Sequence, residues 1–127
     1  MGIRCEWADD QQSVLIWHFE PRWSTEDVRK CKAEVREHLA ATQQRVDFIL
    51  DYSNAGLIPM DFVEFLKQRD NERSPLEGMI VALGVDGLLR TLWRYMSDYL
   101  PPDCQVQFAN SQAEALALIQ AERTQAV

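Results

Sequence analysis

Short apolar runs alternate with amphipathic stretches along most of this 127-residue chain, and this alternation constrains its fold more than any other feature. Apolar runs occupy residues 14–19, 46–50 and 79–83, and apolar residues recur at helical spacing after each run. Strands that are separated by single helices and short links pair in parallel through right-handed crossovers. The sequence therefore predicts an α/β fold with a largely parallel sheet.

Two strands are expected before the first helix. Ile3, Cys5 and Trp7 alternate with polar residues, which is typical of a half-exposed strand, and residues 9–12 have the composition of a turn. The run 14–19 (VLIWHF) is almost continuously apolar, as in a strand that is covered on both faces. We expect a hairpin whose first strand lies antiparallel at the sheet edge and whose second strand is interior.

Capping signals mark the first and the last predicted helix. Ser24 and Asp27 have the spacing of a capping box, and the helix that they open carries an apolar stripe on one side. A fifth strand is expected at residues 104–108, and Ser111 with Glu114 forms a second capping box directly after it. Both helices are expected to pack on the sheet.

Two further helices are predicted in the middle of the chain. Pro59 suits a first helical turn, and the Ser74–Pro75 pair ends that helix. Asp86 can cap the next helix, which runs to about Leu100 before two prolines. The predicted order is strand, strand, helix, strand, helix, strand, helix, strand, helix, in one domain with a core from about residue 3 to residue 122 and with strands two to five mainly parallel.

The composition argues against several classes of binding partner and several cellular locations. The net charge of −7 and the absence of a concentrated basic patch argue against binding nucleic acid or an anionic membrane surface. No apolar stretch approaches the ~20 residues of a membrane helix, so membrane insertion is not expected. The amino terminus lacks the apolar run of a signal peptide, and three cysteines leave one unpaired in any disulfide scheme. We expect a cytoplasmic, bacterial-type protein.

Three segments carry a family resemblance: FILDYSN at 48–54, MIVALGVDGLLRTLWRYM at 79–96 and VQFANSQAEALALI at 106–119. With the predicted element order, they resemble the sulfate-transporter and anti-sigma-factor-antagonist (STAS) domains, especially the branch similar to the sporulation anti-sigma-factor antagonist. The resemblance covers roughly residues 13–122. It implies a STAS-like (βα)n superhelix and a regulatory module that binds a protein partner or a small apolar ligand.

The resemblance also implies that one familiar mechanism is missing. In the phosphoregulated STAS domains, an Asp-x-Ser segment ends strand three and a later Asp-Ser pair, which carries the phosphoserine, opens the next helix. Asp51 and Ser53 match the first segment, but Pro59 and Met60 stand where the Asp-Ser pair aligns. The usual phosphoacceptor is therefore absent, and Ser53 is the nearest hydroxyl.

The loop after the third strand is the first candidate site. Asp51, Ser53 and Asn54 follow the carboxyl end of a parallel strand, where open α/β sheets bind ligands. The same residue types are also common turn formers, so a purely structural role is an open alternative. A small hydrolase or transferase using Asp51 and Ser53 is the competing function, but neither His18 nor His38 can be placed beside Ser53 as a base.

The third predicted helix is apolar over more of its circumference than one sheet contact requires. The excess indicates a hydrophobic pocket, a homodimer or partner surface through this helix, or a wide buried core helix. The residues assigned to the pocket or interface are Phe62, Phe65, Leu66, Trp93, Tyr95 and Met96.

No catalytic residue, metal site or cofactor is predicted, since the histidines and cysteines show no pair at ligand spacing. The leading hypothesis is therefore a non-enzymatic STAS-like module. It would recognise its partner or ligand through the loop after strand three and the adjoining helices.

Overall fold

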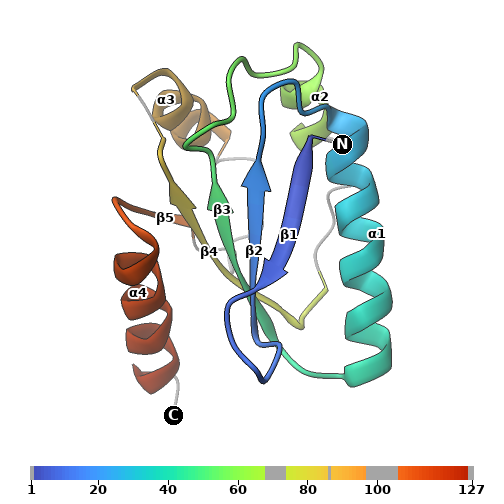
Figure 1. The fold of residues 1–127 in the computed structure, drawn as a ribbon, viewed down its shortest axis with the longest axis vertical. Coiled ribbons are helices and arrows are strands. Elements are labelled where there is room, and N and C mark those ends of the chain that lie inside the picture. Colours follow the sequence, from blue (N-terminus) through green and yellow to red (C-terminus); the bar gives the residue numbers. More distant parts are fainter. Residues whose placement is uncertain (1, 68–73, 86, 97–105, 126–127) are drawn as a thin grey trace.

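Five strands form one mixed sheet in the computed structural model, which describes residues 2–67, 74–85, 87–96 and 106–125. The strands are β1 (Ile3–Trp7), β2 (Val14–Phe19), β3 (Val46–Asp51), β4 (Glu77–Leu83) and β5 (Val106–Ala109). They lie side by side in the order β1-β2-β3-β4-β5 (Figure 1). Only β1 runs antiparallel to its neighbour. The predicted α/β class and the mixed five-stranded sheet are confirmed.

The helices are α1 (Thr25–Thr42), α2 (Phe62–Lys67), α3 (Gly87–Met96) and α4 (Gln112–Gln125). In Figure 1, α1 and α4 lie on opposite sides of the sheet, and α2 and α3 lie near the carboxyl ends of the parallel strands. Among the described residues, no helix combines the length and the apolar character that spanning a bilayer requires. The two short helices therefore lie at the end of the sheet where the parallel strands have their carboxyl ends, which we call the carboxyl edge.

A capping box starts α1 where the sequence predicts it. The Asp27 amide donates to Ser24 Oγ at 3.1 Å, and the Ser24 amide donates to Asp27 Oδ2 at 3.0 Å. These bonds satisfy backbone donors that a helix start otherwise leaves unpaired. The stripe Val28, Cys31, Val35 and Leu39 is buried, so α1 covers the sheet with one face. Gln43 ends the helix in the left-handed conformation, and its amide bonds the Leu39 carbonyl.

The first of the two middle helices begins later than predicted. Residues 59–61 form a turn in which the Phe62 amide bonds the Pro59 carbonyl at 3.1 Å, and α2 begins only at Phe62. The Thr25 hydroxyl donates to Asp61 Oδ1 at 2.6 Å and holds this turn against the start of α1. That tertiary bond provides a reason for the later start. The predicted cap Asp86, the helix end near Leu100 and the strand start at Cys104 lie outside the described residues.

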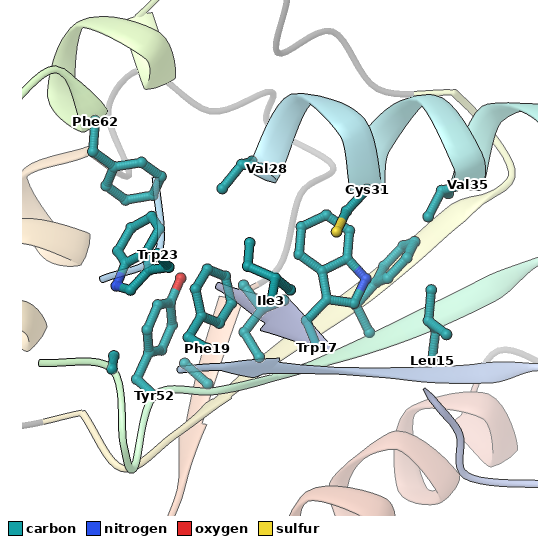
Figure 2. Close-up of a cluster of buried hydrophobic side chains, with 14 of the residues drawn as sticks. Ile3, Leu15, Trp17, Phe19, Trp23, Val28, Cys31, Val35, Tyr52 and Phe62 are labelled. Carbon is teal, nitrogen blue, oxygen red and sulfur yellow. The ribbon is translucent and has the colours of Figure 1, made fainter. Parts of the chain in front are cut away.

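Two hydrophobic cores lie on the two faces of the sheet. The core under α1 is rich in aromatic rings, and Figure 2 shows Phe19 and Tyr52 meeting Trp23 beside it. The rings of Phe19 and Tyr52 stack with centroids 4.3 Å apart, while Trp23 meets Phe19 edge-on at 4.9 Å. The core under α4 is aliphatic and includes Ile49 and Ile119. Strands covered on both faces account for the continuous apolar runs in the sequence.

A buried carboxylate binds α4 by an ion pair to the end of the sheet where the parallel strands begin, which we call the amino edge. Asp47 in β3 is 0% exposed. Its Oδ1 accepts hydrogen bonds from the Met79 amide at 2.8 Å and from Arg45 Nε at 3.1 Å, and its Oδ2 accepts one from Arg123 Nε at 2.7 Å. Arg123 also donates to the Ser13 carbonyl at 2.9 Å. Both carboxylate oxygens are thus paired with charged or backbone donors, as a buried ion requires.

Glycine at position 78 is required by the same contact. A Cβ on Gly78 would overlap Asp47 Oδ1 and lie 2.5 Å from Arg45 Nε. The strand therefore passes close to the carboxylate only because this residue has no side chain.

We expect Asp47→Ala to lower the free energy of unfolding by about 3 kcal/mol, since it leaves the buried Met79 amide without its acceptor and removes one ionic partner from each of Arg45 and Arg123. This loss should lie at the lower end of the range for breaking a buried ion pair. The Arg45 and Arg123 side chains are 39% and 27% exposed, so water can solvate them in the variant. Urea unfolding measures the change. The same substitution at exposed Asp10 serves as the control, and an equal loss for both variants would contradict the role of the buried carboxylate.

Candidate functional site

The loop after β3 lies at the carboxyl edge of the parallel strands, where the sequence places the first candidate site. Asp51 is half-buried, whereas Ser53 and Asn54 are exposed. Asp51 Oδ1 accepts a hydrogen bond from the Ser53 amide at 3.0 Å, and the Ala55 amide bonds the Tyr52 carbonyl at 3.1 Å. Asp51 therefore shapes the turn, while Ser53 and Asn54 present polar groups to solvent.

The loops after β3 and β4 are in direct contact. The Tyr52 amide donates to the Leu83 carbonyl at 2.9 Å, which extends the pairing of the two strands into the loops. Gly84 follows with a φ of +66°, and a Cβ there would lie 2.6 Å from Ser53 Oγ and 2.7 Å from the Ser53 amide nitrogen. Glycine at this position meets both the backbone conformation and the close approach. The two loops therefore form one continuous surface around Ser53.

A histidine lies between two carboxylates next to this loop. His18 in β2 pairs in register with Asp51 in β3, and its Nδ1 lies 3.2 Å from Asp51 Oδ2. Its Nε2 lies 2.7 Å from Glu6 Oε1 in β1. Both ring nitrogens of His18 therefore lie within hydrogen-bond distance of a carboxylate oxygen. Glu6, His18 and Asp51 thus form a charged row across three strands.

This charged row lies on the α4 face of the sheet. Side chains alternate between faces along a strand, so His18 shares a face with Val14 and Ile16, which belong to the core under α4. The sequence interpretation missed the row because it treated each histidine separately. The available signal was positional, since His18 and Asp51 stand at the carboxyl ends of two adjacent parallel strands.

Hydrogen bonding keeps Asp51 ionised. Burial raises the pKa of the Asp51 carboxyl, but the hydrogen bonds from Ser53 and the contact with His18 outweigh burial and hold the pKa below its ordinary value. The ionised carboxylate can therefore accept from the Ser53 amide and pair with His18 at the same time.

The arrangement around Ser53 differs from that of an activated nucleophile. His18 directs both ring nitrogens at carboxylates, and the His38 ring packs against Trp7 with centroids 4.8 Å apart. A serine nucleophile requires a base within hydrogen-bond reach of its hydroxyl. Neither histidine is arranged as that base.

An exposed apolar tip follows the polar part of the loop. Among the described residues, Leu57 and Met60 are the large apolar side chains that are exposed, at 92% and 100%. The segment between and around them is nevertheless anchored, because Ala55 is buried and Ile58 packs against the core under α1. The loop therefore holds two apolar side chains outward on a fixed backbone.

The aromatic residues assigned to a pocket or an interface are only partly described. Phe62, Phe65 and Trp93 are buried and belong to the core under α1. Phe62 meets Trp23 edge-on at 5.0 Å between ring centroids, as Figure 2 shows. The side chains of Leu66, Tyr95 and Met96 lie outside the described residues. A pocket or dimer surface through these six residues stays a prediction.

The charged row carries no indication of a metal site. Within the part of the chain that the structure describes, no group of three His, Cys, Asp or Glu side chains is arranged to hold a metal ion. Comparison of the chain with protein-family models, curated proteins and solved structures finds no match in any of the three.

We expect the stabilisation provided by Asp51 to vanish in acid. A carboxyl with a lowered folded-state pKa stabilises the fold above its unfolded pKa of about 3.9, and this contribution is lost as the pH falls through the folded value. The difference in free energy of unfolding between the wild type and Asp51→Asn should be largest near neutral pH. Urea titrations from about pH 6 to about pH 2.5 measure it. A constant difference, matching that of the exposed control Asp10→Asn, would refute the contribution.

Proposed function

We propose that this protein is a non-enzymatic, STAS-like binding module that recognises a protein partner through the loop between β3 and α2. The observation that carries the proposal is the exposure of Leu57 and Met60 on an anchored loop. Exposing large apolar side chains to water is unfavourable, and a contact that covers them gains roughly 25 cal/mol per Å² of buried apolar surface. A fixed backbone also reduces the entropy cost of ordering the loop on binding.

The charge around the loop indicates the chemistry of the partner. Residues 51–64 contain three acidic side chains, Asp51, Asp61 and Glu64, and no Lys or Arg. Asp61 and Glu64 are exposed beside the apolar tip. A complementary surface would have an apolar hollow for Leu57 and Met60 with basic residues at its rim. A second copy of this chain, with its own charge of −7, fits such a surface less well than a basic protein does.

The STAS resemblance supports a regulatory role of an altered kind. The consecutive order of parallel strands is the arrangement that the resemblance implies. Under that resemblance, Met60 occupies the place of the phosphoserine, and its side chain is fully exposed. A residue without a hydroxyl at this place would let an apolar contact form without control by a kinase at that position. We therefore propose constitutive binding at the loop.

The hydrolase or transferase alternative receives less support from the geometry. A hydrolytic mechanism through Ser53 needs a general base, but both nitrogens of His18 face Asp51 and Glu6. The Asp51 carboxylate accepts hydrogen bonds from both the amide and the side chain of Ser53, and these bonds order the turn. The observed bonds fit a loop built to hold its shape.

We expect the double variant Leu57→Ser, Met60→Ser to bind its partner at least tenfold more weakly while its free energy of unfolding changes by less than about 0.5 kcal/mol. The partner is first captured by placing a photoreactive benzoylphenylalanine at position 60 and irradiating cells. Its affinity for the purified wild type and the variant is then measured by calorimetry. The loss is expected because both side chains are exposed in the free protein and would be covered in the complex.

Two matched controls separate this loop from the rest of the surface. The first places the photoreactive residue at Gln120, which is exposed on α4 on the opposite side of the sheet. The second introduces serine at Ala113 and Ala117, which are exposed on the same helix. Equal cross-linking from positions 60 and 120, or an unchanged Kd for the double loop variant, would overturn the proposal.

A further inference from the structure

Two cysteines that are distant in the sequence lie in contact between β1, the outermost strand of the sheet, and helix α1. Cys5 is exposed on β1, and Cys31 is buried on α1. Both are free thiols, and their sulfurs lie 3.6 Å apart. Figure 2 shows the Cys31 sulfur directed from α1 toward the sheet. A disulfide needs an S–S separation of about 2.05 Å, so side-chain rotation with a small strand displacement can close the gap.

The edge position of β1 makes this closure feasible. β1 hydrogen-bonds to β2 on one side only, since it is the outermost strand of the sheet. It can therefore move toward α1 without breaking pairing on a second side. A cystine between Cys5 and Cys31 would join the outermost strand covalently to the helix that covers it.

Small molecules can reach the two sulfurs. Two cavities, of about 170 Å³ and about 200 Å³, are each lined by both cysteines. Glu34 also lines both cavities, and the larger one includes Lys30. Either volume exceeds the roughly 30 Å³ occupied by one water molecule, so a peroxide of similar size fits.

The two thiols differ in reactivity. The contact with Cys31 lowers the pKa of the Cys5 thiol, although burial and the charge of Glu34 both act to raise it. The contact with Cys5, followed by burial and the nearby carboxylates, raises the pKa of Cys31. The exposed sulfur therefore forms the thiolate more readily, and the thiolate is the reactive species.

We propose that Cys5 and Cys31 form a reversible oxidation site, in which Cys5 reacts first with a peroxide and Cys31 then closes an intramolecular disulfide. This site is independent of the partner-binding loop, because it lies between β1 and α1 and contains no residue of that loop. Oxidation and reduction of this site would switch β1 between a strand that only packs against α1 and one that is covalently bound to it.

The reaction balances with hydrogen peroxide as the oxidant. The Cys5 thiolate attacks one peroxide oxygen, the O–O bond breaks, and after proton transfer the products are a sulfenic acid and one water. The Cys31 sulfur attacks the sulfenic sulfur and loses its proton, and the S–O bond breaks to release a second water. Two thiols lose two electrons and two protons, and one peroxide is reduced to two waters. A thiol reductant reverses the bond by thiol–disulfide exchange.

Intact-mass spectrometry of a Cys104→Ser background, which removes the third thiol, tests the proposal. Limited peroxide should lower the mass by about 2 Da and reduce the maleimide-reactive thiols to none, and dithiothreitol should restore both. In the Cys31→Ala variant of this background, dimedone should trap the sulfenic acid on Cys5. In Cys5→Ser, Cys31 should resist dimedone because it is buried.

The rate of disulfide formation in denaturant shows whether the fold itself brings the two sulfurs together. Disulfide formation in the folded protein should be at least about tenfold faster than in guanidinium chloride, because the fold already holds the two sulfurs together. Equal or slower closure in the folded state would overturn the proposal. Dimedone labelling of Cys31 in preference to Cys5, or two free thiols after peroxide treatment of the folded background protein, would overturn it as well.

Discussion

The buried carboxylate of Asp47 is the constraint around which the sheet and its last helix are arranged. An ionised group without water needs charged or strongly polar partners, and these come from β3, β4 and α4. Arg123 can reach it only when α4 lies along the sheet, and β4 can pass only because residue 78 is glycine. The position of α4 is thus fixed by charge as well as by the aliphatic core beneath it.

The two edges of the parallel sheet therefore serve different purposes. At the amino ends of the strands, the two cations Arg45 and Arg123 are balanced by the two acids Asp47 and Glu122 within the fold. At the carboxyl edge, Glu6, His18 and Asp51 are only partly covered, and the following loop turns apolar side chains toward solvent. A charge network at one end of the strands and an exposed loop at the other fit the common arrangement of α/β domains, in which a rigid scaffold positions the loops.

Local patterns predicted the elements better than the contacts between them. The alternation at Ile3–Trp7 and the capping box at Ser24 depend only on neighbouring residues, so both strand and helix start could be predicted. The start of α2 could not, because it depends on the bond between Thr25 and Asp61. The role of Asp47 could not be predicted either, because this residue lies within an apolar run. Its role follows from an arginine 76 positions away, which a pattern in one segment cannot reveal.

The consecutive strand order has a consequence for synthesis on the ribosome. Each strand pairs with the one made just before it, so the sheet can grow in the order in which the chain emerges. Asp47 is an exception, because Arg123 near the carboxyl terminus is among its partners. Until that residue emerges, the carboxylate lacks one of its charged partners and must retain water. The interior around Asp47 can therefore be completed only after α4 has been synthesised.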